Sequence, residues 1–196
     1  METIKINNID YKIEDRDYWL NNGDNVSAIH INRGLLSVLS ELPVQRYNRY
    51  LMELVSRILI YETFWPEDPG IDHQQFGNTL YSFMRSNEVR SWLLEEDNIP
   101  NRVVIRDLVY DVIISEKGDQ FLDATDCTGQ IKQGQLKIFI LSGIPEQRKK
   151  AVLLHEITHG LLHEAGLEDH DDDKIVRPLT NMLHNFFLDN DFSFLR

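Results

Sequence analysis

An HExxH motif within an apolar stretch constrains this chain more than any other feature. Residues 153–163 read LLHEITHGLLH, and apolar residues before and after the motif recur at the spacing of a helix with one buried face. In such a helix His155 and His159 lie one turn apart on the same side, where two neutral imidazoles can bind one zinc ion. Glu156 would lie beside them, facing a metal-bound water. The alternative is an ordinary amphipathic helix with a solvated His and Glu face.

The third ligand of a catalytic zinc site should come from the segment after the motif helix. We expect that helix to begin near Pro145 and to stop at Gly166. His163 lies one turn beyond His159 and is better explained as a half-exposed helix residue. The loop that follows supplies further candidates for the third ligand. We favour Asp173, at the start of a helix predicted over residues 175–187. His170, Asp171 and Asp172 remain open as alternatives, and Glu168 belongs to the same acidic loop. These aspartates could instead only cap the next helix.

The order of predicted elements in the second half repeats that of the first. Alternating runs predict strands over residues 3–13, with an irregularity at Asn7-Asn8, over 28–39, with a break near Arg33-Gly34, and over 103–114 and 135–141. Helical periodicity predicts helices from about residue 44 to Trp65, over 74–84, over 88–96 and from Pro145. Pro43 aligns with Pro145, Tyr11 with Tyr110 and Asn78 with Asn181, with small shifts between them.

These alignments predict an α+β fold built as a tandem duplication of a ββαα unit, with antiparallel strands packed on the HExxH helix. Residues 1–87 would form a first copy, residues 88–102 a helical linker and residues 103–196 the copy with the motif. The first copy has Glu53, Leu54 and Arg57 where the second has His155, Glu156 and His159, so we expect it to lack the metal site. A single α+β domain with coincidental similarity is the alternative.

The charge and composition of the chain limit the classes of molecule that it can bind and the compartment that suits it. The formal net charge of −12, from 32 acidic and 20 basic residues, argues against nucleic acid and anionic lipid, which require a positive field. The single cysteine, Cys127, excludes an internal disulfide framework and suits a reducing compartment. No signal peptide and no stretch of 18 apolar residues is evident, so we expect a cytoplasmic protein.

The second half resembles small HExxH proteins of phage and prophage genomes in the zincin-like superfamily, related to the ImmA/IrrE metallopeptidases. The shared frame is the corner at residues 126–129, the strand after it, the motif with its flanking leucines, the stop at residues 164–167 and the helix from Ile175. The resemblance implies a zinc peptidase-like domain with His155 and His159 as ligands, Glu156 as base and an acidic third ligand near the next helix. Arg177 and Pro178 stand where relatives tend to carry acid, which leaves Asp173 as the substitute.

Two functions follow from these expectations. The first is a cytosolic zinc metallopeptidase that acts on a protein or peptide substrate, with Glu156 as general base. The strand over residues 135–141, if it lies at a sheet edge, would hold an extended peptide by backbone hydrogen bonds. The second is a non-catalytic, phage-encoded protein that binds or inhibits a host protein through its acidic surface. The intact His155, Glu156 and His159 favour the peptidase.

Overall fold

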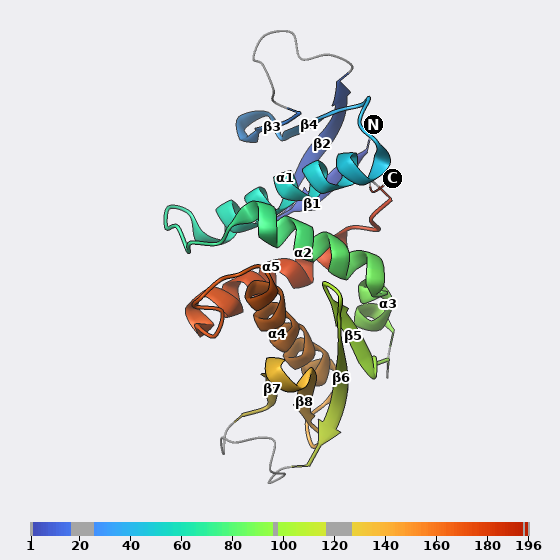
Figure 1. Cartoon of the computed structure of the whole chain (residues 1–196), viewed down its shortest axis with the longest axis vertical. Helices are drawn as coiled ribbons and strands as arrows, with labels where there is room; N and C mark the ends of the chain where they lie inside the picture. The colour runs from blue at the N-terminus through green and yellow to red at the C-terminus, as the bar shows by residue number, and fades with distance from the viewer. Residues whose placement is uncertain (1, 17–25, 96–97, 117–126, 194, 196) are drawn as a thin grey trace.

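The chain folds into two four-stranded sheets at opposite ends of an elongated molecule, with helices between them (Figure 1). This computed structural model describes residues 2–16, 26–95, 98–116, 127–193 and 195. Within these residues it contains five α-helices and eight strands. The predicted α+β class is therefore confirmed.

The first sheet shows why residues 3–13 alternate with an irregularity in the middle. Strands β1 (Thr3–Ile6) and β2 (Ile9–Arg16) form a hairpin, so the prediction of one strand was wrong. Asn7 and Asn8 make the turn with φ of 50° and 62°, values that asparagine tolerates better than most residues. Strands β3 (Ser27–His30) and β4 (Leu35–Leu39) follow, separated by a 3₁₀ turn that ends at Gly34, where φ is +55°.

The second sheet repeats this arrangement. Strands β5 (Arg102–Ile105) and β6 (Leu108–Ser115) form the hairpin, and β7 (Gly129–Lys132) and β8 (Lys137–Leu141) follow. The sequence did not predict β7, which is four residues long and begins at the last residue of the segment interpreted as a corner. Each half therefore has four strands before its helices, and the predicted ββαα order undercounts them.

The strand order corrects two further expectations. The sheets run β1-β2-β4-β3 and β5-β6-β8-β7, and the central pairs β2/β4 and β6/β8 are parallel, so the sheets are mixed and not antiparallel throughout. Strand β8 lies between β6 and β7 and cannot accept an added peptide strand at an edge, because both of its sides are already paired. The expectation that residues 135–141 hold a peptide was therefore wrong, and the edge strands of this sheet are β5 and β7.

Five helices occupy the middle of the molecule. They are α1 (Val44–Phe64), α2 (His73–Ser86), α3 (Val89–Leu94), α4 (Glu146–Glu164) and α5 (Asp173–Asp189). These bounds agree with the predicted helices to within a few residues. Helix α3 falls in the segment interpreted as a linker.

In each half, the second long helix packs on the sheet of the other half. Helix α2 packs on β5 of the second sheet, and α5 packs on β1 of the first. Asn87, after α2, accepts from the Val104 N–H at 2.8 Å and donates to the Val104 carbonyl at 2.7 Å. Asn190, after α5, makes the same pair of bonds to Lys5, at 2.8 and 2.9 Å. One continuous apolar core joins residues from both halves. Among the described residues, no helix is long and apolar enough to cross a membrane.

Candidate functional site

The motif residues lie on helix α4, whose apolar face is buried in the core. Leu153, Leu154 and Ile157 are fully buried and fix the rotation of the helix against the core. Pro145 precedes its first turn and Gly166, with φ of +82°, follows its end, as predicted. His155 is therefore left half-buried at the surface of a cavity, while Glu156 and His159 are 7% and 9% exposed.

The imidazoles of His155 and His159 converge with the carboxylate of Asp173. The two Nε2 atoms are 3.2 Å apart, and His155 Nε2 is 3.3 Å from Asp173 Oδ1. One potential ligand atom from each of the three residues lies within 4.8 Å of the others, and no other such group of His, Cys, Asp or Glu occurs among the described residues. The structure thus brings together the three residues that the sequence proposed as ligands.

Two of these distances match those between neighbouring ligands of a tetrahedral zinc ion. With zinc–nitrogen bonds of about 2.0–2.1 Å and tetrahedral angles, two ligand nitrogens lie about 3.3 Å apart. The His159 Nδ1 lies 2.7 Å from the His170 carbonyl, which can only accept, so Nδ1 carries the proton and Nε2 presents a lone pair to the cluster. Burial and the neighbouring His159 lower the pKa of His155, although Asp173 opposes this, and a lowered pKa favours the neutral imidazole that a metal requires.

Asp173 reaches the cluster from the first turn of α5. The helix is capped by the preceding residue, because Asp172 accepts from the Lys174 N–H at 2.9 Å. Asp173 is consequently free to direct Oδ1 toward His155 while Oδ2 accepts from Arg177 Nη2 at 2.7 Å. Arg177, which the sequence marked as a departure from the resembling proteins, therefore orients the candidate carboxylate.

The other loop residues proposed as ligands lie outside the cluster. His170 contributes its backbone carbonyl to His159, and its ring packs on His163 with centroids 4.6 Å apart. Asp171 is 3.7 Å from His159 Nδ1, the nitrogen already bonded to the His170 carbonyl, and its side chain is 79% exposed. Glu168 is exposed.

Glu156 is held against the edge strand that the sequence missed. Its Oε2 accepts from the Ile131 N–H of β7 at 2.9 Å. Burial raises the pKa of Glu156 to about 7; the Ile131 hydrogen bond opposes the shift, and the charges of Asp173 and Asp171 add to it. A carboxylate with this pKa can both accept and release a proton near neutral pH. Gly129 permits the close approach of β7, since a Cβ there would overlap Val152 Cγ1 and lie 2.9 Å from Glu156 Oε1.

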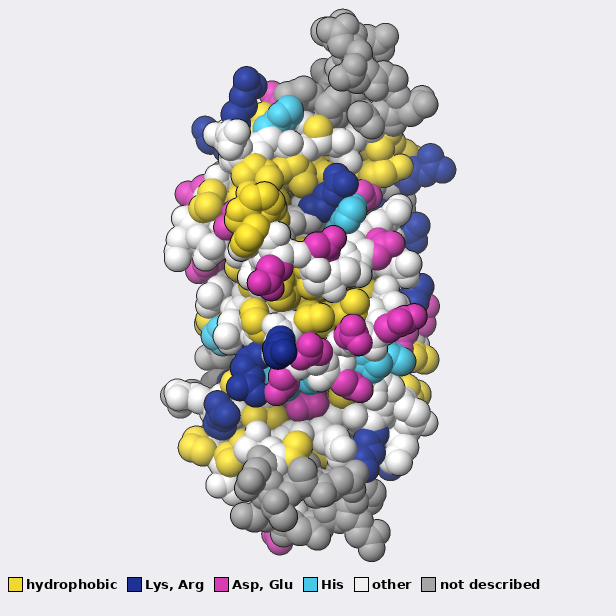
Figure 2. Space-filling model, turned by 90° about the vertical axis from the view of Figure 1, so that its left-hand side faces the viewer, with side chains coloured by type: hydrophobic (Ala, Val, Ile, Leu, Met, Phe, Trp, Pro, Cys, Tyr) yellow, Lys and Arg dark blue, Asp and Glu magenta, His cyan; other side chains and the backbone are white. Residues whose placement is uncertain are grey.

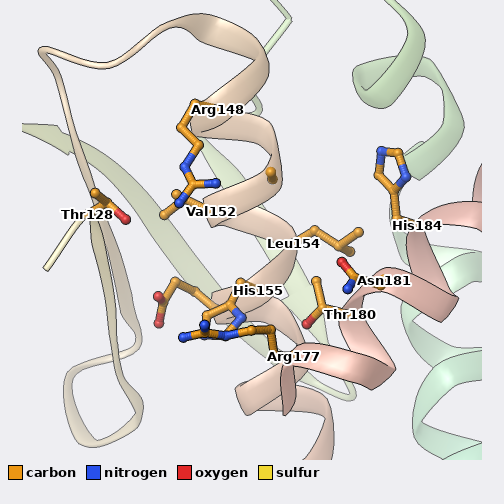
Figure 3. Close-up of a pocket in the computed structure, with 11 residues that line it drawn as sticks. Thr128, Arg148, Val152, Leu154, His155, Arg177, Thr180, Asn181 and His184 are labelled. Atoms are coloured by element: carbon orange, nitrogen blue, oxygen red, sulfur yellow. The ribbon is translucent and has the colours of Figure 1, made fainter. Parts of the chain in front are cut away.

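A cavity of about 470 Å³ opens between α4 and α5 beside these residues (Figure 3). His155 and Glu156 line it together with Thr180 of α5. The corresponding helix pair of the first half packs closely through Gly77, where a Cβ would lie 2.8 Å from the Met52 carbonyl oxygen. The alignment places Thr180 at the position of Gly77, and its larger side chain is compatible with the wider separation of α4 and α5.

The first half uses the positions of the motif differently. Glu53 lies 3.9 Å from His73 Nε2, Leu54 is buried in the core and Arg57 is exposed. A leucine and an arginine supply no metal ligand, so the chemistry of this site belongs to the second half.

On the face shown in Figure 2, acidic and histidine side chains gather beside basic ones in the half of the molecule that contains α4 and β7. Sequence reasoning missed the Ile131 N–H, the His170 carbonyl and the Arg177 ion pair, because each depends on which segments meet in space. Comparisons of the chain with protein-family models, with curated proteins and with solved structures found no match.

Proposed function

We propose that this protein is a zinc-dependent metallopeptidase. The observation that carries the proposal is the convergence of His155, His159 and Asp173 beside the buried Glu156 at one cavity. Two imidazoles and one carboxylate are a common ligand set of catalytic zinc sites, which keep a further position open for water.

Bound zinc would supply a Lewis acid that polarises the scissile carbonyl and lowers the pKa of water. Glu156 would take the proton of the attacking water and return it to the leaving amine, tasks that suit its raised pKa of about 7. The Ile131 N–H holds its carboxylate in one orientation. Arg177 and the His170 carbonyl would hold Asp173 and His159 in their binding geometry.

We further infer that the two halves are copies of one zincin-like unit. The support is the shared strand order and a nearly constant offset between equivalent strands. Strands β1 and β5 begin at Thr3 and Arg102, 99 residues apart, and β4 and β8 begin at Leu35 and Lys137, 102 residues apart. The matching hydrogen bonds of Asn87 and Asn190 add to this support. Each asparagine follows the last helix of a helix pair and bonds to a strand in the sheet of the other half.

The test combines metal content with hydrolysis. Elemental mass spectrometry should find about one zinc per chain in the wild type, in Glu156→Gln and in the control His163→Ala, and should find it lost in His155→Ala. Mass spectrometry of a peptide pool should show cleavage by the wild type that falls at least about a hundredfold in Glu156→Gln. Zinc in His155→Ala at the wild-type level, or equal cleavage by Glu156→Gln, would refute the proposed roles.

A further inference from the structure

The cavity beside the motif is lined by more basic than acidic side chains, although the chain as a whole is acidic. Among its lining residues, Arg148 and Arg177 carry guanidinium groups, and the only carboxylate is that of Glu156, which is buried. The chain as a whole has a formal net charge of −12. Since Arg177 is paired with Asp173, Arg148 is the lining cation that can attract an anionic group on a molecule that enters the cavity.

The two arginines differ in their partners. Arg177 is bound to Asp173 at 2.7 Å and belongs to the support of the site. Arg148 is exposed and has no ion pair or side-chain hydrogen bond with any part of the chain that the structure describes. It lies in the first turn of α4, where the helix dipole disfavours positive charge. Helix stability therefore does not account for an arginine at this position.

Arg148 lies on the same face of α4 as His155. Seven residues separate them, which is two turns and about 10 Å along the helix axis. Figure 3 shows the Arg148 side chain pointing along α4 and ending beside Val152, with His155 and Arg177 further along in the same direction. A peptide in extended conformation advances about 3.3 Å per residue, so two or three residues span this distance.

Side chains, more than backbone pairing, must position a substrate here. The Ile131 N–H of the edge strand β7 is bound by Glu156, and the Gly129 carbonyl accepts from Cys127 Sγ. These two backbone groups of the edge next to α4 are thus already engaged, and an added peptide strand would have to displace those bonds.

We propose that Arg148 binds a carboxylate of the peptide substrate two or three residues from the scissile bond. This rests on the proposed function. A guanidinium recognises a carboxylate through two parallel N–H bonds, and the same chemistry is offered by an aspartate or glutamate side chain and by a peptide C-terminus. Arg148 is a specificity-determining residue in this scheme and takes no part in proton transfer.

Cleavage-site profiling tests the proposal with zinc-loaded wild type, Arg148→Gln and Arg148→Glu. The matched control is Arg46→Gln, since Arg46 occupies the same position of α1 in the half without the motif. Sites cleaved by the wild type should have an acidic residue two or three positions from the scissile bond, or should lie that far from a free C-terminus. Amidation of the C-terminus should abolish the preference for a free C-terminus and leave the preference for acidic residues unchanged.

Kinetics on matched octapeptides with glutamate or glutamine at the preferred position give the size of the effect. Arg148→Gln should raise KM for the glutamate peptide about tenfold with kcat little changed, leave the glutamine peptide unaffected and retain its zinc. Arg148→Glu should prefer a lysine peptide, and Arg46→Gln should behave as wild type. Equal KM values for the glutamate peptide in wild type and Arg148→Gln would overturn the proposal.

A binding measurement separates this proposal from the peptidase function. Calorimetric titration of Glu156→Gln with the glutamate octapeptide should give an affinity about tenfold higher than titration of Glu156→Gln/Arg148→Gln. If no peptide is cleaved by the wild type but this difference is found, the peptidase function fails and the carboxylate site stands. If the glutamate peptide binds to neither protein, or equally to both, the site is refuted.

Discussion

Replacing Glu156 by glutamine should change how the stability of the zinc-free protein depends on pH. The carboxyl has a pKa raised from its ordinary value of 4.5 to about 7 in the folded protein. Its favourable contribution is therefore fully present below pH 4.5, where it is protonated in both states, and is lost as pH rises through about 7. A difference of about 2.5 pH units corresponds to about 3 kcal/mol.

Urea denaturation in the presence of a chelator measures this contribution. Between pH 4.5 and 8, the free energy of unfolding of the wild type should fall by about 3 kcal/mol relative to Glu156→Gln, because the amide does not titrate and its oxygen can still accept from Ile131. The comparison cancels the titration of all other groups. Parallel pH profiles, or a variant that becomes relatively less stable as pH rises, would refute the conclusion that burial controls this carboxyl.

Three further results follow from the same structure. Gly129→Ala should lower the free energy of unfolding by about 1–3 kcal/mol in urea denaturation, because its Cβ meets Val152 and Glu156, whereas Gly134→Ala, with no atom within 4 Å, should cost less than about 1 kcal/mol. Asp173→Ala should weaken zinc affinity at least about tenfold in a competition assay, while Asp172→Ala should cost about 1 kcal/mol of stability through loss of the helix cap and leave zinc affinity unchanged; the reverse pattern would identify Asp172 as the ligand. Asn190→Ala should destabilise the protein by about 2 kcal/mol, and an unchanged denaturation midpoint would show that its two bonds to Lys5 are replaced by water.

The helices could be predicted because their signals are local. Pro145 and Gly166 mark the ends of α4, and Asp72 and Asp172 supply the caps of α2 and α5. Both hairpin turns were missed, because residues 3–13 and 103–114 were each interpreted as one strand, although the Asn7-Asn8 pair is a local signal for a turn. Arg106, with φ of 59°, has no comparable preference for this conformation, so the second turn carries no local signal of that kind.

The pairing of strands could not be predicted, because it depends on segments distant in sequence. Each parallel pair joins strands that are not consecutive, and β7 is a four-residue strand whose pattern is too short to separate it from a loop. The expectation of an edge position for β8 failed for this reason.

The sequence by itself determined which groups could bind a metal, since the helical repeat places His155 and His159 on one face and Glu156 beside them. It also indicated that the first half lacks these groups. Only the tertiary structure showed which loop residue lies beside the two histidines, because Asp172 is used as a cap and the His170 backbone holds His159, while Asp173 meets His155. It decided as well that Glu156 is buried against β7, which raises its pKa. Ligand identity follows from local spacing, whereas burial and the pairing of charges follow from how distant segments pack.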